Sequence, residues 1–182
     1  MIQIRIHGRG GQGNVTLAEL IAMAAFYEGK QAQAFPMFGV ERKGAPVAAF
    51  VKIDDKFIRS REQIYNPDII IIQDPSLIRI TDILKGVNNK TLVIINSNQY
   101  AKECQMAKGK VYCISALDIA LKNIGKPIIN TAMLGAFAKL SGLIKLDSAI
   151  KAIEVKLGEK YGEDIINKNI RAIKEAYALA GK

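Results

Sequence analysis

The distribution of apolar residues along the chain predicts strands first and helices later. Ile2, Ile4 and Ile6 alternate with polar residues, which is typical of a strand with one buried face. Residues 69–72 are continuously apolar and follow Asn66-Pro67-Asp68, as expected of a strand buried on both faces. The segments that we expect to form strands are residues 2–7, 47–53, 57–60, 69–72, 91–95 and 111–114.

Helical patterns lie between these strands and dominate the last third of the chain. Residues 15–27, VTLAELIAMAAFY, are rich in Ala and Leu and contain no Gly or Pro. Thr16 and Glu19 have capping-box spacing, although the helix can begin a turn earlier, near Gly11. Asn130 and Asp147 are predicted N-caps. The segments that we expect to be helical are residues 15–27, 77–84, 99–107, 116–123, 131–141, 147–161 and 163–180.

Strands that alternate with helices predict an α/β fold of three layers, with a mostly parallel sheet covered by helices on both faces. A hairpin at Asp54-Asp55-Lys56, between strands 47–53 and 57–60, would make this sheet mixed. By length, the 182 residues are expected to form a single domain. Its sheet region would span residues 1–115, and its helical C-terminal part would span residues 116–182.

The sequence feature that carries chemistry is a glycine-rich turn, HGRGGQG, between the first strand and the first helix. Such a turn brings free backbone N–H groups and the positive end of a helix to one point, which suits an anion such as phosphate. Glycine also permits positive φ and the close approach of a ligand. The candidate binding residues in the turn are Gly8, Arg9, Gly10, Gly11, Gln12 and Gly13.

Gly8, Gly10 and Gly13 also fit the G-x-G-x-x-G pattern of dinucleotide-binding folds. That interpretation requires a second strand that ends in Asp or Glu about 20 residues later. Residues 29–38, GKQAQAFPMF, show no apolar strand and no terminal acid, so the pattern argues against a dinucleotide site. Two alternatives remain open: a tight turn that packs the helix on the sheet, and anion recognition shared with a partner subunit.

A second glycine-bearing segment, FGVERKGAPV at residues 38–47, adds two cations. Arg42 and Lys43 lie on an expected loop between Pro36 and Pro46. With Arg9 they would bring three cationic side chains to one phosphorylated ligand, Arg42 through bidentate contacts and Lys43 as a point charge. A surface loop whose charges pair with Glu41 or with solvent is the alternative.

Together, HGRGGQGNVTLAELIA and QAFPMFGVERKGAPVAAFVKI closely resemble the gamma subunit of the 2-oxoacid:ferredoxin oxidoreductases, most of all the enzymes that act on pyruvate. Residues 130–137, NTAMLGAF, and the Asp74-Pro75-Ser76-Leu77 turn resemble further family motifs, so the resemblance covers nearly the whole chain. Two positions depart from the family pattern. Lys43 stands where a second arginine is expected, and lysine keeps the charge but lacks the planar guanidinium group of arginine. Asn14 stands where a small apolar residue is commoner.

The resemblance implies a subunit with no catalytic residues of its own in a larger assembly. In that family, alpha and beta subunits hold thiamine diphosphate with Mg, and a delta subunit or domain carries [4Fe–4S] clusters together with beta. The complex oxidatively decarboxylates a 2-oxoacid, passes electrons to ferredoxin and forms an acyl-coenzyme A, or runs in reverse to fix CO2. For this chain the resemblance implies coenzyme A (CoA) as a candidate ligand at Gly8 to Gly13, Arg42 and Lys43.

Some questions stay open after this resemblance. Pyruvate, 2-oxoisovalerate, 2-oxoglutarate and indolepyruvate enzymes share this subunit type, so the resemblance alone does not fix the 2-oxoacid. The glycine turn could pack against a neighbouring subunit and bind no ligand, which would make the chain a scaffold. An independent nucleotide-binding protein is the alternative outside the family.

Composition removes several other classes of function. An iron–sulfur or zinc site normally needs four clustered ligands, so Cys104 and Cys113 cannot form one within this chain. We expect both cysteines to pack as small apolar side chains, since a disulfide is unexpected in a reducing compartment. His7, the only histidine, has no evident partner for a general base and is expected to pack beside the glycine turn.

The formal net charge of +9 raises the question of nucleic-acid binding. The lysines are spread along the chain without a basic run, and there is no Trp, so we expect no nucleic-acid partner. A positive surface would instead attract acidic subunits or an acidic ferredoxin. No apolar run reaches the roughly 18 residues of a membrane span, and the N-terminus does not resemble a signal peptide. We therefore expect no membrane association and a cytoplasmic location.

Overall fold

The computed structural model describes residues 1–37, 44–98 and 102–182, and it contains a six-stranded sheet with the order β2-β3-β1-β4-β5-β6. The strands are β1 (Ile2–Arg9), β2 (Gln31–Pro36), β3 (Pro46–Asp54), β4 (Ile69–Ile72), β5 (Leu92–Asn96) and β6 (Lys110–Ile114). The helices are α1 (Asn14–Tyr27), α2 (Leu77–Ile80), α3 (Lys102–Met106), α4 (Ala116–Ile124), α5 (Asn130–Ser141), α6 (Leu146–Gly158) and α7 (Glu163–Leu179).

The sheet is mixed, as predicted, but the antiparallel strand is β3. Strands β1, β4, β5 and β6 pair in parallel, whereas β3 runs antiparallel to both β1 and β2. The carboxyl ends of the parallel strands therefore meet at one edge. Because β3 runs the opposite way, it begins at that same edge, where Pro46 pairs with Arg9.

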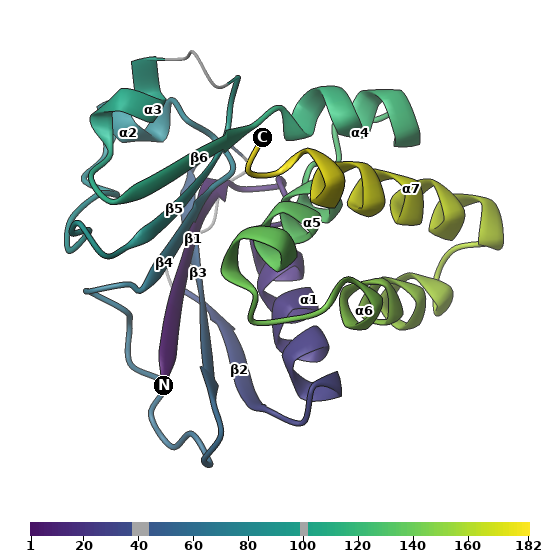
Figure 1. The fold of residues 1–182 in the computed structure, drawn as a ribbon, viewed down its shortest axis with the longest axis horizontal. Coiled ribbons are helices and arrows are strands. Elements are labelled where there is room, and N and C mark those ends of the chain that lie inside the picture. Colours follow the sequence, from purple (N-terminus) through teal and green to yellow (C-terminus); the bar gives the residue numbers. More distant parts are fainter. Residues whose placement is uncertain (38–43, 99–101) are drawn as a thin grey trace.

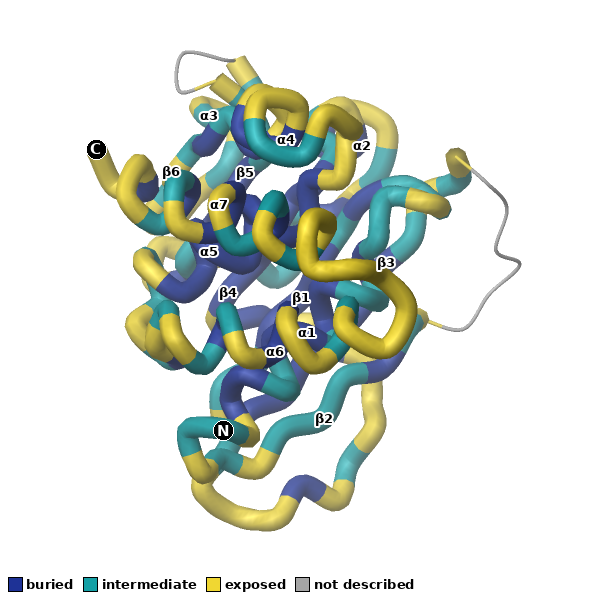
Figure 2. The backbone as a smooth tube through the Cα atoms, turned by 90° about the vertical axis from the view of Figure 1, so that its right-hand side faces the viewer, coloured by how far each residue is buried: buried dark blue, intermediate teal, exposed yellow. Residues whose placement is uncertain are grey.

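Helices cover both faces of the sheet, which confirms the predicted three-layer α/β architecture (Figure 1). Helices α1 and α4 to α7 lie on one face, and the short helices α2 and α3 lie on the other. Figure 2 shows the buried residues gathered along the central strands and the inner sides of α1 and α5. We call the face under α1 and α4 to α7 the helical face, and the opposite one the coil face.

The apolar patterns read from the sequence correspond to this layering. Ile4 and Ile6 of β1 belong to the large apolar cluster on the helical face. In β4, Ile71 lies in that cluster, whereas Ile70 and Ile72 lie in a second cluster on the coil face. The continuous apolar run of β4 is therefore buried on both faces, as predicted.

Close packing of α5 against α7 depends on Gly135, which lies in the NTAMLGAF segment at residues 130–137. A side chain added at Gly135 would overlap the backbone carbonyl of Ile173 in α7. Met133 and Phe137 of α5 are fully buried. The small residues of this segment thus serve packing inside the chain.

Two strand predictions were wrong. Residues 29–38 were predicted to contain no strand, but Gln31–Pro36 form β2. An edge strand beside β3 needs only small inward side chains such as Ala32 and Ala34. Residues 57–60, predicted as the second strand of a hairpin, form no strand, because β3 is already paired on both sides. The chain from residue 57 to residue 64 instead crosses the coil face, where Ile58 and Ile64 are buried.

The predicted helix caps were displaced. Gly13, not Thr16, is the N-cap of α1, and its left-handed conformation (φ 77°) suits glycine. Ile129 and Lys145 occupy the N-cap positions of α5 and α6, one and two residues before the predicted Asn130 and Asp147. The helices at 77–84 and 99–107 are shorter than predicted, and residues 99–101 lie outside the described residues.

The expectation of two separate cysteines was also wrong. Cys104 of α3 and Cys113 of β6 form a disulfide, because the turn between them folds α3 back against the last strand. Both side chains still pack partly against the apolar cluster of the coil face. Among the described residues, no helix is long and apolar enough to cross a lipid bilayer.

Candidate functional site

The glycine turn joins the carboxyl end of β1 to the start of α1, where its own side chains fix its shape. The backbone N–H of Arg9 donates to Gln12 Oε1 at 2.6 Å, and the backbone N–H of Gln12 donates to the Arg9 carbonyl at 3.0 Å. Gly11 has φ 94°, in the left-handed region that favours glycine. Gln12, predicted as a ligand contact, therefore closes the turn in this structure.

The turn leaves a group of backbone donors free. Gly11, Gly13, Asn14, Val15 and Thr16 direct N–H groups for which no acceptor occurs among the described residues. The first turn of α1 contains no acidic side chain that could compensate these donors. Unsatisfied N–H groups and the positive end of a 14-residue helix together form an anion-binding arrangement.

A network of two buried amides, Asn14 and Gln73, and the half-buried amide of Asn96 supports the turn. Gln73, directly after β4, donates from Nε2 to Asn14 Oδ1 at 2.7 Å, and Asn14 Nδ2 donates to the Arg9 carbonyl at 3.3 Å. Asn96, at the end of β5, donates to the Gln73 carbonyl at 2.9 Å. The network ties the carboxyl ends of β1, β4 and β5 together. It also gives Asn14, the unusual residue in the family pattern, a defined role in positioning α1.

The absence of a side chain at Gly8 makes this network possible. A Cβ at Gly8 would overlap Asn14 Oδ1 and lie 2.8 Å from Gln12 Oε1. Gly13 is similarly restricted, because a Cβ there would lie 2.9 Å from Asn130 Nδ2 at the start of α5. The glycines at positions 8 and 13 therefore leave room for the amide side chains of Gln12, Asn14 and Asn130 to pack against the turn.

The Arg9 side chain extends to the Asp74 turn. Its Nε donates to Asp74 Oδ2 at 2.5 Å, and its two terminal nitrogens donate to Ser76 Oγ at 2.9 Å and to the Gly44 carbonyl at 3.1 Å. The glycine turn and the Asp74-Pro75-Ser76-Leu77 turn, both noted in the sequence, are thus linked directly. In this arrangement Arg9 organises the loops around the turn.

The ion pair between Arg9 and Asp74 affects the pKa of the Asp74 carboxyl group. Desolvation, the largest single influence, raises the pKa of Asp74, but hydrogen bonds from Ser76 and Arg9 together outweigh it. The pKa of Asp74 is therefore lowered from its ordinary value, and the carboxylate is charged at neutral pH.

The second glycine segment meets the first. Gly44 donates its N–H to the Gly10 carbonyl at 3.1 Å, and Gly10 donates to the Ala45 carbonyl at 2.9 Å. The predicted cations Arg42 and Lys43 lie outside the described residues. The next residue along the chain, Gly44, is hydrogen-bonded to the glycine turn. The described end of the second glycine segment therefore lies against the first glycine segment.

His7 lies beneath the turn and is unsuited to proton transfer at neutral pH. Burial, with a smaller contribution from the nearby charge of Arg5, lowers the pKa of His7 to about 3. Its Nε2 is buried and has no hydrogen-bond partner among the described residues. The imidazole therefore remains neutral, in agreement with the packing role expected from the sequence.

A cavity of about 520 Å³ lies beside the start of α1. Thr16, whose N–H has no acceptor in the described part of the chain, lines it, and so does Asn130, which packs against Gly13. Apolar side chains from α1, α6 and α7 form much of the wall, and Lys126 and Lys168 also line the cavity. Among the described residues there is no cluster of His, Cys, Asp and Glu side chains suited to a metal ion.

The position of the turn agrees with a general property of open α/β sheets. The strand order reverses between β1 and β4, because the chain continues from β1 toward β2 and β3 on one side and to β4, β5 and β6 on the other. Ligands in such sheets bind outside the carboxyl ends of the strands at this reversal. Sequence reasoning found the turn but missed Gln73 and Asn96. Their only signal is a polar residue directly after a buried apolar run.

Comparison with known proteins places this geometry in a family. Residues 3–179 match the family model described as pyruvate ferredoxin/flavodoxin oxidoreductase. The chain is 49% identical to pyruvate synthase subunit PorC of Methanothermobacter thermautotrophicus over 177 residues, covering 97% of this chain and 94% of that protein. It is 49% identical to the pyruvate/ketoisovalerate oxidoreductases common subunit gamma of Thermococcus kodakarensis, covering 97% and 96%.

A solved structure agrees with these sequence relatives. The crystal structure of pyruvate oxidoreductase subunit PORC from Thermotoga maritima superimposes with a TM-score of 0.83 at 32% identity, covering 97% of this chain and 95% of that one. Both the sequence and the fold match over almost the full length. The chain belongs to the pyruvate ferredoxin/flavodoxin oxidoreductase family.

Proposed function

We propose that this chain is the gamma subunit of a pyruvate:ferredoxin oxidoreductase complex, which converts pyruvate, CoA and oxidised ferredoxin reversibly to acetyl-CoA, CO2 and reduced ferredoxin. The observation that carries the proposal is 49% identity over nearly the whole chain to relatives named pyruvate synthase subunit PorC and pyruvate/ketoisovalerate oxidoreductases common subunit gamma. The chain works with alpha, beta and delta subunits, which supply thiamine diphosphate, Mg and [4Fe–4S] clusters. It is not catalytic alone.

The alternative substrates within the family are 2-oxoisovalerate, 2-oxoglutarate and indolepyruvate. One relative is named as a gamma subunit common to pyruvate and ketoisovalerate oxidoreductases. A subunit of this type can therefore serve more than one 2-oxoacid, with selectivity supplied by the subunits that line the thiamine site.

Affinity purification of the chain from its native cells, followed by mass spectrometry, tests the assembly. We expect thiamine-binding and cluster-binding subunits to co-purify, and their identity reports the 2-oxoacid. A chain recovered alone as a monomer would refute the subunit assignment and would favour an independent nucleotide-binding protein.

Within the complex, we assign the glycine turn to the phosphates of CoA. The N–H groups of Gly11, Gly13 and the first turn of α1 find no acceptor within residues 1–37, 44–98 and 102–182, which supports this assignment because a phosphate would satisfy them. The apolar cavity beside Thr16 offers adjacent surface for a less polar part of the ligand. Arg42 and Lys43 would add charge-assisted contacts from the segment that ends at Gly44.

Steady-state kinetics of the reconstituted complex tests this assignment. Arg42→Ala or Lys43→Ala should raise KM for CoA about ten- to hundredfold, since each charge-assisted contact contributes roughly 1.5–3 kcal/mol. Lys56→Ala is the matched control, because Lys56 is exposed just after β3, at the opposite end of the sheet. Impaired assembly with an unchanged KM would show that the loop binds a neighbouring subunit and that the chain is a scaffold.

A further inference from the structure

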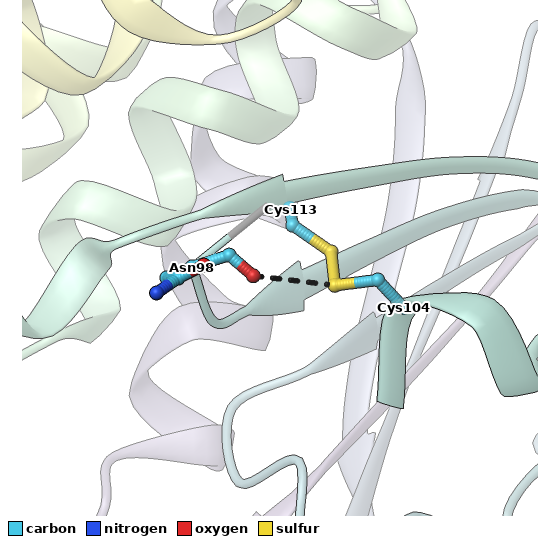
Figure 3. Close-up of a disulfide and its surroundings, with 3 residues drawn as sticks. All are labelled: Asn98, Cys104 and Cys113. Atoms are coloured by element: carbon cyan, nitrogen blue, oxygen red, sulfur yellow. Dashed lines mark hydrogen bonds between the residues drawn. A yellow bond between two sulfur atoms is a disulfide. The ribbon is translucent and has the colours of Figure 1, made fainter. Parts of the chain in front are cut away.

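The disulfide between Cys104 and Cys113 fastens a short helix to the edge of the sheet. Figure 3 shows Cys104 at α3 and Cys113 on β6, with the sulfur atoms bonded. Their Cα atoms are 6.5 Å apart, within the range that a disulfide spans without backbone movement. The two residues are separated by nine positions, so the bond closes a small loop.

Among the described residues, few other interactions hold α3 in place. The helix has five residues, none of which is buried, and so short a helix is not stable by itself. An ion pair of 2.7 Å between Glu103 and Arg79 connects it to α2. Besides the backbone through residues 107–109, Cys104 supplies a covalent cross-link between α3 and β6.

The disulfide is accessible to small molecules. Both cysteines are half-buried, in contrast to structural cysteines inside a core. Cys113 lines a surface cavity of about 430 Å³ with Asn98 and Ser115. Both cysteines line a second cavity of about 390 Å³ with Tyr112 and Gly181. A low-molecular-weight thiol or disulfide can therefore reach the sulfur atoms without unfolding of the core.

The surroundings also accommodate the reduced state. Cys104 Sγ lies 3.6 Å from the backbone carbonyl oxygen of Asn98, as the dashed line in Figure 3 marks. After reduction, the Cys104 thiol has this carbonyl as a hydrogen-bond acceptor. Cys113 retains its place in the sheet, because β6 pairs with β5 through backbone hydrogen bonds. Both oxidation states are thus compatible with an intact sheet.

We propose that Cys104 and Cys113 form a reversible thiol–disulfide site that exchanges with low-molecular-weight disulfides and controls the attachment of α3. One cysteine thiolate attacks the reagent disulfide, so that a mixed disulfide forms and one reagent thiol leaves. The second cysteine thiolate then attacks the protein sulfur of the mixed disulfide, and a second reagent thiol leaves. The protein loses two electrons and two protons, which the reagent disulfide gains. This proposal does not depend on the assignment of CoA to the glycine turn.

Equilibration of the full-length chain with mixtures of reduced and oxidised glutathione, under anaerobic conditions, tests the exchange. After an acid quench, alkylation and mass spectrometry count the free thiols. We expect Cys104 and Cys113 to lose their label together in one two-electron transition, which reduced glutathione reverses. Cys104→Ser and Cys113→Ser are matched controls, in which the remaining cysteine should stay free or form a mixed disulfide with the reagent.

Hydrogen exchange of the wild-type chain in both states tests the consequence for α3. We expect the amides of α3 to exchange faster after reduction, whereas those of β5 remain unchanged because that strand is paired on both sides. Two results would overturn the proposal. One is that both thiols remain free in excess oxidised glutathione, and the other is that α3 exchanges at the same rate in both states.

Discussion

The two faces of the sheet are held by different means. On the helical face, α1 and α4 to α7 bury one continuous apolar cluster. On the coil face, α2 and α3 are short, and irregular segments cover the rest with two smaller apolar clusters. On this face, polar side chains of the sheet donate hydrogen bonds to backbone carbonyls of the irregular segments and hold them in place. The comparison indicates that polar anchors compensate where the chain supplies little helical surface.

Arg5 is the main polar anchor of the coil face. Its guanidinium donates to the carbonyls of Ile64 at 3.1 Å and Ile83 at 2.7 Å, and also to those of Tyr65 and Lys85. It thus joins two coil segments that are distant in sequence. Burial lowers the pKa of Arg5, but the side chain remains a cation at any physiological pH. Carbonyls in coil that would otherwise be buried without partners obtain donors in this way.

Loss of apolar volume on the helical face should have the largest effect on stability. Phe137 is fully buried between α5 and its neighbours, so Phe137→Ala should lower the free energy of unfolding by about 3–5 kcal/mol. Urea denaturation followed by circular dichroism measures the change. Phe57→Ala is the matched control, since Phe57 is 76% exposed and its loss should change stability by less than about 0.5 kcal/mol. Equal losses in the two variants would contradict the burial argument.

Removal of the Arg5 guanidinium should have the next largest effect. Arg5→Met keeps much of the apolar stem but leaves four carbonyls without this donor, at an expected cost of about 2–3 kcal/mol. Hydrogen exchange should increase in the segments around residues 64 and 85 more than in α5 or α7. Arg61→Met, at an exposed position, serves as the control. A uniform increase over both faces would show that Arg5 acts globally and not as a local anchor.

Loss of the Asp74 carboxylate should have a smaller and pH-dependent effect. Asp74→Asn should cost about 1 kcal/mol at pH 7, because the charge-assisted contact with Arg9 weakens. The folded-state pKa of Asp74 lies below its ordinary value of 3.8, so its contribution is present above that pH and disappears as the pH falls through the folded pKa.

Urea denaturation over a range of pH checks the sign. The difference between wild type and Asp74→Asn should be largest at neutral pH and should shrink below about pH 4. Glu62→Gln, at an exposed position on the coil face, should show no comparable difference. A difference that grows on acidification would exclude the Arg9–Asp74 pair as its cause.

The smallest effect should come from an exposed ion pair on the helical face. Lys156 of α6 lies 2.8 Å from Glu19 of α1, and both side chains are more than a third exposed. A double-mutant cycle with Glu19→Gln and Lys156→Met should give a coupling of about 0.5 kcal/mol or less. A coupling as large as the Arg5 effect would remove the proposed distinction between the two faces.

The elements with strong periodicity could be predicted from the sequence. Residues 69–72 form β4 with the predicted boundaries, since four consecutive isoleucines fit a strand buried on both faces. The edge strand β2 was missed because its alanines lack the bulk that usually marks a strand. Residues 57–60 were predicted as a strand on local pattern alone. These residues could form a strand beside β3 only if β3 had an unpaired side, and that depends on the strand order of the whole sheet.

The candidate site was predictable to a similar extent. The glycine turn and the Asp74 turn were found because glycine and proline leave local signals. Arg9 links the two turns by a hydrogen bond to Ser76, which lies 67 positions away in the sequence. Gln73 is hydrogen-bonded to Asn14, 59 positions away, and also to Asn96. Contacts of that range depend on strand order. The disulfide was missed for the same kind of reason, because spacing alone does not report the fold of α3 against β6.

The antiparallel course of β3 has a consequence for protein engineering. Met37 donates to the Ala48 carbonyl and Gly44 donates to the Gly10 carbonyl, so the chain leaves the sheet and returns to it at two neighbouring points. We therefore expect that exchange of residues 38–43 between relatives leaves the register of β2, β3 and β1 unchanged. Chimeras built at these two junctions would transfer whatever selectivity the segment carries, while the scaffold around it remains constant.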